Sequence, residues 1–221
     1  MGSGAPGAFA GTALLRNHWS GPARPRAYYW YLLFAGATEA RALAARCQQA
    51  IAFPYYDQVP PPGLHLTLDR IGTEAGVSAA QLRSIEAAAR RACQAIPPFR
   101  ITLGPVEGSP GAVGFMAAPV GRIHQLRDAL RAATLSACPD APVMREAPPP
   151  HVTIAYANTD DVPAADAIAA VSKLNATATA PGAEAAVAEA TLVLLERRQR
   201  AYAWQPVARI PLAGAPGEAR A

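Results

Sequence analysis

Lysine and cysteine are scarce in this sequence, and long apolar runs are absent from it. Lys173 is the only lysine among 221 residues, so arginine carries nearly all of the positive charge, and the formal net charge is only +4. Affinity for polyanions grows with the number of phosphates neutralised, so this small excess favours a short or small ligand over long nucleic acid. No run approaches the roughly eighteen apolar residues that cross a membrane, and no secretory signal pattern opens the chain. We therefore expect a cytoplasmic protein with no membrane partner.

The cysteines exclude two further classes of protein. Cys47, Cys93 and Cys138 lie far apart and form no CxxC pair, which argues against a disulfide-stapled scaffold and against a structural zinc site. We expect reduced, mostly buried thiols, no metal and no cofactor. Apolar residues make up 51% of the sequence, enough for one domain of two lobes or for two small domains with a core each.

Hydrophobic periodicity predicts strands and helices in alternation. Strands are expected at 28–34, 64–71, 99–106, 113–118, 151–156, 187–195 and 201–210, and helices at 39–52, 78–96, 121–137 and from 161 onward. Ser78 and Gln81 form a capping-box pattern at the start of the second helix. This order indicates an α/β (α+β) protein in which helices pack on sheets.

Composition divides the chain into three parts. Residues 1–26 are rich in Gly, Ala and Pro and show no sustained period, which predicts a flexible N-terminal arm with Trp19 as its candidate docking side chain. Residues 27–212 carry the periodic segments and are expected to form a single domain, and 213–221 are expected to be a C-terminal tail.

Two short motifs repeat the same pattern in the two halves of the chain. His65 and Thr67 follow a Pro-Pro-Gly-Leu stretch, and His151 and Thr153 follow three prolines eighty-six residues later. Within a strand, residues two apart share one face, so each histidine lies beside its threonine while apolar neighbours fill the other face. A single His-x-Thr is more often a polar surface pair, but two copies in corresponding places indicate one shared site.

Two imidazoles that face each other suit in-line displacement at phosphorus. One removes a proton from the attacking oxygen and the other delivers a proton to the leaving oxygen, and histidine can do both near neutral pH. The threonine hydroxyls can donate to the nonbridging oxygens, where charge gathers in the transition state. This chemistry needs no metal, and no acidic ligand cluster stands near either motif. His18 and His124 lack such a setting and are expected to be structural.

The motifs His65-x-Thr67 and His151-x-Thr153 resemble those of the 2H phosphoesterase superfamily, which includes the 2′-5′ RNA ligases and the RNA 2′,3′-cyclic phosphodiesterases. The resemblance covers roughly residues 26–212. It implies a bilobal fold with two mixed or antiparallel sheets, helices outside and a central cleft, with one motif on each lobe. It also implies a monomer that cleaves 2′,3′-cyclic phosphates or 2′-5′ linkages in RNA ends or small nucleotides, with 2′-5′ ligation as the reverse reaction.

Three further residues are candidates for substrate binding. Tyr29 and Tyr31 share the less apolar face of the aromatic first strand, where they could stack on a base or donate to a phosphate, or else form part of the core. Arg145 lies six residues before the second motif and could bind a phosphate bidentately. The cluster of Arg197, Arg198 and Arg200 is more simply a hairpin tip in solvent.

Strand parity leads to two more expectations. Asp69 shares the face of His65 and Thr67, where it would either orient an imidazole or end the strand, whereas Tyr156 should point into the packing. Two other functions stay open beside the phosphodiesterase. One is an enzyme acting on a small metabolite such as an ADP-ribose cyclic phosphate, and the other is an RNA-end binding protein without turnover.

Overall fold

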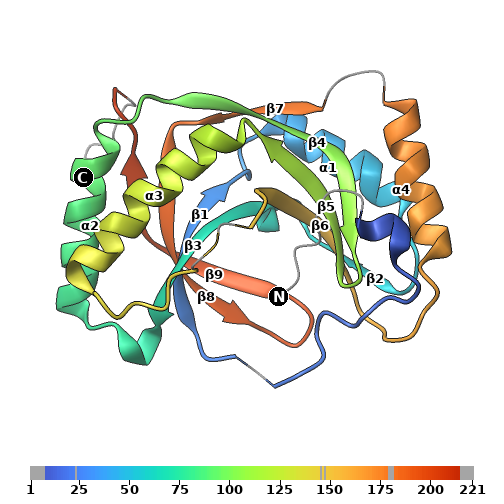
Figure 1. The fold of residues 1–221 in the computed structure, drawn as a ribbon, viewed down its shortest axis with the longest axis horizontal. Coiled ribbons are helices and arrows are strands. Elements are labelled where there is room, and N and C mark those ends of the chain that lie inside the picture. The colour runs from blue at the N-terminus through green and yellow to red at the C-terminus, as the bar shows by residue number, and fades with distance from the viewer. Residues whose placement is uncertain (1–7, 23, 145, 147, 179–181, 215–221) are drawn as a thin grey trace.

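The structure is a computed structural model that describes residues 8–22, 24–144, 146, 148–178 and 182–214. Its strands are β1 (Ala27–Leu33), β2 (Tyr56–Gln58), β3 (His65–Thr73), β4 (Phe99–Ser109), β5 (Ala112–Ala118), β6 (His151–Ala157), β7 (Ala183–Val187), β8 (Glu189–Arg197) and β9 (Tyr202–Pro211). Its helices are α1 (Thr38–Ala50), α2 (Ala79–Cys93), α3 (Val120–Ala137) and α4 (Ala165–Thr177). The predicted elements are present, and β2 and β7 are additional (Figure 1).

The strands form two antiparallel halves that meet at one seam. Their order is β7-β4-β5-β6-β3-β1-β8-β9, with β2 paired to β6. Every pairing between the described strands is antiparallel, and β6 and β3 are joined by a single residue pair, Leu66 with Val152. The first half therefore holds β3, β1, β8 and β9, and the second holds the remaining strands. This is the predicted α+β fold with one motif in each half.

Helices cover the outside of each half. In Figure 1, α2 and α3 lie together on the left beside the first half, and α1 and α4 lie on the right beside the second. The capping box predicted for α2 is present, because the Ser78 side chain accepts from the Gln81 backbone and the Gln81 side chain accepts from the Ser78 backbone. Within the described ranges, every helix is too short or too polar to span a bilayer.

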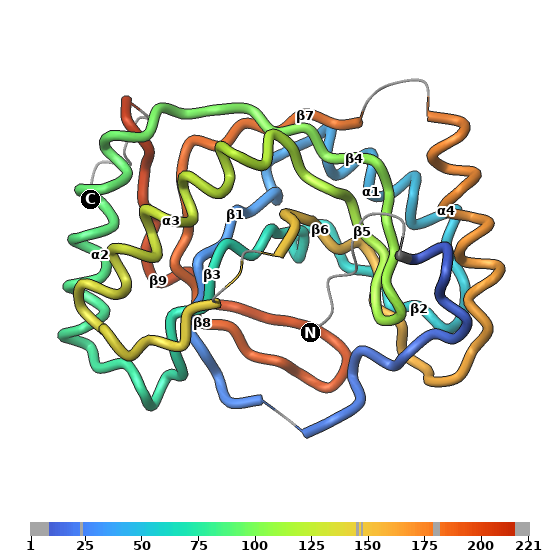
Figure 2. Tube along the Cα trace, viewed as in Figure 1, coloured from blue at the N-terminus to red at the C-terminus, as the bar shows by residue number. Residues whose placement is uncertain are grey.

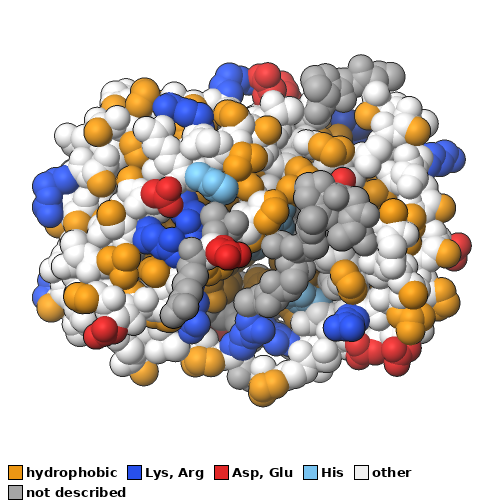
Figure 3. All heavy atoms as spheres, in the orientation of Figure 1, with side chains coloured by type: hydrophobic (Ala, Val, Ile, Leu, Met, Phe, Trp, Pro, Cys, Tyr) orange, Lys and Arg blue, Asp and Glu red, His pale blue; other side chains and the backbone are white. Residues whose placement is uncertain are grey.

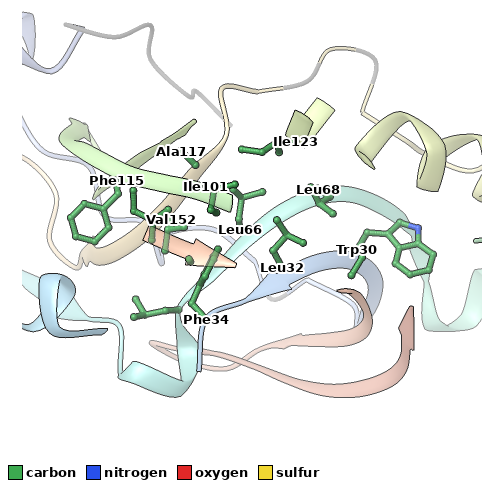
Figure 4. Close-up of a cluster of buried hydrophobic side chains, with 14 of the residues drawn as sticks. Trp30, Leu32, Phe34, Leu66, Leu68, Ile101, Phe115, Ala117, Ile123 and Val152 are labelled. Carbon is green, nitrogen blue, oxygen red and sulfur yellow. The ribbon is translucent and has the colours of Figure 1, made fainter. Parts of the chain in front are cut away.

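One apolar cluster runs beneath both motifs. Leu66 and Val152, each 1% exposed, lie near Ile101 and Phe115 in the close-up of Figure 4. Trp30 is fully buried in the same cluster and donates from Nε1 to the Thr134 hydroxyl of α3 at 3.0 Å. The strand pair that carries the motifs therefore rests on the core, which holds its outward-facing side chains in place.

The N-terminal segment 8–22, which we call the strap, packs against the body of the protein. Phe9 and Leu15 are buried, and Trp19 is 8% exposed. Backbone bonds tie the strap to the second half, with Leu15 donating to Val162 and His18 donating to Ala157. In Figure 2 the strap, in dark blue, runs from the side of α4 along the lower edge toward β1.

Candidate active site

The two His-x-Thr motifs meet at the seam between the halves. Leu66 and Val152 are paired and point into the core, so their neighbours in each strand point to the opposite face. The four residues that share this face are His65, Thr67, His151 and Thr153.

The register of the seam relates the motifs by a local twofold arrangement. Continued one residue either way, the Leu66–Val152 pair sets His65 across from Thr153 and Thr67 across from His151. The histidines are then diagonal neighbours, with Cα atoms roughly 7–8 Å apart. The positive charge of His151 also contributes to lowering the pKa of His65. The structure thus brings together the two imidazoles that the sequence placed in separate halves.

Each imidazole is held by the carbonyl of the residue two positions before it. His65 Nδ1 donates to the Gly63 carbonyl at 2.8 Å, and His151 Nδ1 donates to the Pro149 carbonyl at 2.9 Å. A carbonyl oxygen can only accept, so Nδ1 carries the hydrogen in both rings and Nε2 is left for a substrate. The proline-rich loops before the motifs therefore supply the groups that fix the tautomers.

The environment of His65 keeps it neutral. Its ring stacks on Tyr31 with centroids 4.3 Å apart and meets the edge of Trp204 at 4.9 Å. Burial, with a smaller contribution from the charge of His151, lowers the pKa of His65 to about 4, against the opposing effect of the Gly63 bond. His151 is exposed on the same face. The two imidazoles are therefore chemically distinct.

The ring contact between His65 and Trp204 shows that the sheet is strongly curled. Trp204 lies on β9, three strands away from β3 by way of β1 and β8. In a flat sheet, three steps would separate the strands by about 14 Å, yet the ring centroids are 4.9 Å apart. The motifs therefore lie on a concave face, with the β8–β9 hairpin folded over it.

A tyrosine hydrogen-bonds to each motif threonine. Tyr31 pairs with the Thr67 side chain, and Tyr156 pairs with the Thr153 side chain. Burial raises the pKa of both phenols, so both keep their protons. Tyr31 is 2% exposed, which leaves it no face for the base stacking that we predicted. Tyr29, half-buried on the same strand, stays a candidate for that contact.

Both motif strands contain a bulge directly after the threonine. In β3, Leu68 is the extra residue between the pairs Tyr31–Thr67 and Trp30–Asp69. In β6, the extra residue is Ile154, between the β5 pairs that involve Thr153 and Ala155. Strict alternation ends at each bulge, so side chains beyond it exchange faces.

The bulge in β6 corrects the prediction for Tyr156. We expected its side chain in the packing, but its ring stacks on His18 at 4.2 Å and meets Tyr202 at 5.6 Å on the concave side. His18 Nε2 lies 2.8 Å from the Tyr202 hydroxyl, and burial, followed by the charges of Arg197 and Arg24, lowers the pKa of His18 to about 4. His18 is thus a neutral member of an aromatic cluster beside the motifs.

The bulge in β3 corrects the prediction for Asp69. Its carboxylate does not orient an imidazole, because the side chain is 1% exposed on the α3 side of the sheet. It accepts from the Met144 backbone at 3.0 Å and lies 3.3 Å from Arg131 Nε and 3.8 Å from an Arg127 nitrogen. Arg127 also donates to the Met144 carbonyl at 2.8 Å. Asp69 therefore anchors the loop that leads into the second motif.

Gly114 permits the close approach of β5 at the second bulge. A Cβ atom at this position would lie 2.5 Å from the Val152 carbonyl oxygen. We expect Gly114→Ala to displace the backbone on either side of Thr153 and to destabilise the protein by about 1–3 kcal/mol. Gly121→Ala is the matched control, because a Cβ there meets nothing within 4 Å. Equal midpoints for the two variants in urea unfolding would contradict the prediction.

The hairpin tip and the strap fasten the two halves at one end of the concave face. Asp57 of β2 accepts from Trp19 Nε1 at 2.9 Å and from Arg200 Nε at 2.8 Å. Arg197 donates to the Trp19 carbonyl, and its guanidinium lies over the indole ring. The arginine cluster was predicted to lie free in solvent, and this is true only of Arg198, which is exposed and pairs with Glu196. Arg197 binds the strap and Arg200 binds Asp57 of the second half. Arg145 lies outside the described residues.

The family model of the 2′-5′ RNA ligase superfamily matches residues 32–199. The chain belongs to this superfamily. No curated protein sequence gives a significant match to it. Among solved structures, TT0787 of Thermus thermophilus is similar with a TM-score of 0.63 and 23% identity, over 86% of this chain and 98% of that one. E. coli LigT complexed with 3′-AMP gives 0.60 and 23%, over 86% and 99%.

The superfamily assignment accounts for the fold and supports a phosphoesterase or ligase-like activity. The match begins at residue 32, so the strap with His18 and Trp19 lies outside the superfamily region. Within the described ranges, no three His, Cys, Asp or Glu side chains are placed to hold a metal ion. Tyr156, Tyr202 and Trp204 also line the concave face, and the sequence did not predict this. The one available signal was the spacing of Tyr202 and Trp204, which are two residues apart in a predicted strand and therefore share a face.

Proposed function

We propose that the protein is a phosphodiesterase that cleaves 2′,3′-cyclic phosphates or 2′-5′ linkages in nucleotides and RNA ends by two-histidine acid–base catalysis. The observation that carries the proposal is the pairing of two Nδ1-anchored imidazoles at the seam, each with a free Nε2 on the concave face. The proposed steps use no metal ion, because the two imidazoles accept and deliver the protons and the threonine hydroxyls donate to the nonbridging oxygens.

The different environments of the histidines support different roles for them. His65, with a pKa of about 4, is neutral at working pH and accepts a proton from the attacking water at Nε2. The new O–P bond forms as the bond from phosphorus to one ribose oxygen breaks, and His151 Nε2 donates a proton to that departing oxygen. The product is a nucleoside monophosphate. When the 5′-hydroxyl of a second ribose attacks the cyclic phosphate in place of water and the 3′-oxygen departs with a proton, the same course forms a 2′-5′ linkage.

The threonines and tyrosines complete the site. Tyr31 lies against the Thr67 side chain, and Tyr156 lies against the Thr153 side chain. When the substrate is bound, the hydroxyls of Thr67 and Thr153 can donate to the nonbridging oxygens of the phosphate. Donors fixed before the reaction stabilise the developing charge without reorganising.

The decisive assay measures turnover in EDTA. The protein is incubated with nucleoside 2′,3′-cyclic phosphates, ADP-ribose 1″,2″-cyclic phosphate and 2′-5′ dinucleotides, and the monophosphate isomer formed is identified. Turnover of a nucleotide substrate that survives chelation supports the proposal, and the isomer shows which oxygen leaves. Cleavage of the ADP-ribose compound alone would point to a small-metabolite enzyme, and binding without turnover would point to an RNA-end binding protein.

We expect an unusually acidic limb in the pH profile. A general base must be neutral, and His65 is neutral above its pKa of about 4. The value of kcat/KM should therefore show no loss as the pH falls from 7 to about 5 and should then drop, tending toward tenfold per unit below pH 4. Tyr31→Leu, which uncovers the ring, should move this limb to higher pH.

Circular dichroism at each pH separates this effect from acid unfolding. A wild-type limb that already begins near pH 6.5, with the protein still folded, would contradict the assignment of a base whose pKa is lowered by burial.

A further inference from the structure

Arg70 lies on the concave face in the same strand as His65 and Thr67. It is paired with Tyr29 across β1 and β3, between the bulges at Leu68 and Ile71, and residues directly paired across two strands leave the same face. The rings of Tyr29 and Tyr31 are 5.9 Å apart, and Tyr31 stacks on His65, so this face is the one that carries the motifs. The β3 bulge is what turns Arg70 toward it.

The guanidinium of Arg70 has no counter-charge in the described part of the protein. Its Nε is buried without a hydrogen-bond partner. The backbone N–H of Arg70 donates to the Asp69 carboxylate, but no ion pair or hydrogen bond joins the Arg70 guanidinium to another described residue. By contrast, Arg127 and Arg131 face Asp69, and Arg200 binds Asp57. A partly buried cation without a partner is costly in the free protein, and an anionic ligand would supply what is missing.

The two halves of the site differ at this position. Arg70 is the fifth residue after His65, and Tyr156 is the fifth residue after His151. Because β3 and β6 run in opposite directions from the seam (Figure 1), these side chains lie toward opposite ends of the motif face. One end therefore offers a cation and the other an aromatic cluster. Lys and Arg side chains border the hollow in the middle of the surface seen in Figure 3.

We propose that Arg70, with Tyr29 beside it, binds a second phosphate of the substrate, separate from the phosphate that reacts. Thr67 and Arg70 pair with Tyr31 and Tyr29, which are two residues apart in β1, so about 7 Å separates them along the sheet. The arginine therefore lies beside the reacting phosphate and is a specificity residue. The second phosphate can be a terminal monoester or the next diester of an RNA end. This inference rests on the proposed function and narrows its substrate to nucleotides with two phosphates.

The test compares substrates that differ only in the second phosphate. They are a nucleoside 2′,3′-cyclic phosphate, the same nucleotide with a 5′-phosphate, and a dinucleotide that ends in a 2′,3′-cyclic phosphate. We expect Arg70→Gln to lower kcat/KM about 10- to 100-fold on at least one of the last two and less than about twofold on the first. Arg70→Lys should lose less activity than Arg70→Gln on the same substrates. Lysine keeps the positive charge but lacks the planar guanidinium that binds a phosphate with two parallel hydrogen bonds.

Arg100→Gln is the matched control, because it removes the same charge from a side chain that is 64% exposed at β4 and pairs with Glu184. It should change none of the three values by more than about twofold. A loss confined to the 5′-phosphorylated nucleotide identifies a terminal phosphate, and a loss on the dinucleotide identifies a chain phosphate. Equal losses on all three substrates, or no loss on any, would overturn the proposal.

Calorimetry keeps this test independent of turnover. The wild-type protein should bind a nucleoside 3′,5′-bisphosphate more tightly than the 3′-monophosphate, and Arg70→Gln should abolish the difference. If no substrate turns over but this difference is seen, the proposed function fails and the phosphate subsite stands. If both ligands bind the wild-type protein equally, the subsite fails whatever the activity.

Discussion

Replacing either His65 or His151 by alanine will reduce kcat/KM on the cyclic phosphate substrate by about 10²- to 10⁴-fold. This is the range that a single positioned acid or base contributes. Each ring projects from the concave face, while Leu66 and Val152 hold the strands in the core, so the variants should fold normally. Steady-state kinetics measure the loss, and thermal unfolding confirms the fold.

His124→Ala is the control for this experiment. It also removes an imidazole, but from α3 and outside both motifs. Its kcat/KM should stay near the wild-type value. The double variant of His65 and His151 should lose little more than the worse single variant, because the two groups act in one transition state. Full turnover in both single variants would refute the mechanism.

Asp69→Asn will destabilise the protein by about 3–5 kcal/mol, the range observed when one partner of a buried ion pair is removed. The carboxylate is 1% exposed and faces both Arg127 and Arg131. Asparagine keeps the shape of the side chain but removes the buried counter-charge that Arg127 and Arg131 share. Equilibrium unfolding in urea measures the change.

Asp128→Asn gives a stringent comparison, because Asp128 pairs with the same Arg127 while its side chain is 65% exposed. An exposed ion pair contributes about 0–1 kcal/mol. Equal effects of the two substitutions would show that the buried carboxylate is not needed for stability. Since Asp69 also holds the Met144 backbone, Asp69→Asn should lower turnover even where the protein remains folded.

The fold and the centre of the site could be predicted because both depend on local patterns. Alternation within four residues places His65 with Thr67 and His151 with Thr153, and it requires no knowledge of the partner strand. The capping box at Ser78 is equally local. Strand β7 was missed because Ala183–Val187 is mostly alanine, which has low strand propensity and is held extended by its pairing with β4.

The surroundings of the site depend on partners that are distant in sequence. Tyr156 and Asp69 were placed on the wrong face because a bulge is set by the register of the neighbouring strand, which one strand's own residues do not reveal. The contact of Trp19 with Asp57 likewise spans segments that share no motif. Arg70 was not predicted as a site residue because the same bulge in β3 turns its side chain to the concave face.

The single backbone bridge between the halves has a mechanical consequence. One pair of residues resists bending poorly, so besides the shared core the angle between the halves depends on the contacts of Arg200 and Trp19 with Asp57. That angle sets the gap across which both protons travel. A molecule that broke the contacts of Asp57 with Arg200 and Trp19 would change the rate of the reaction without binding near either imidazole.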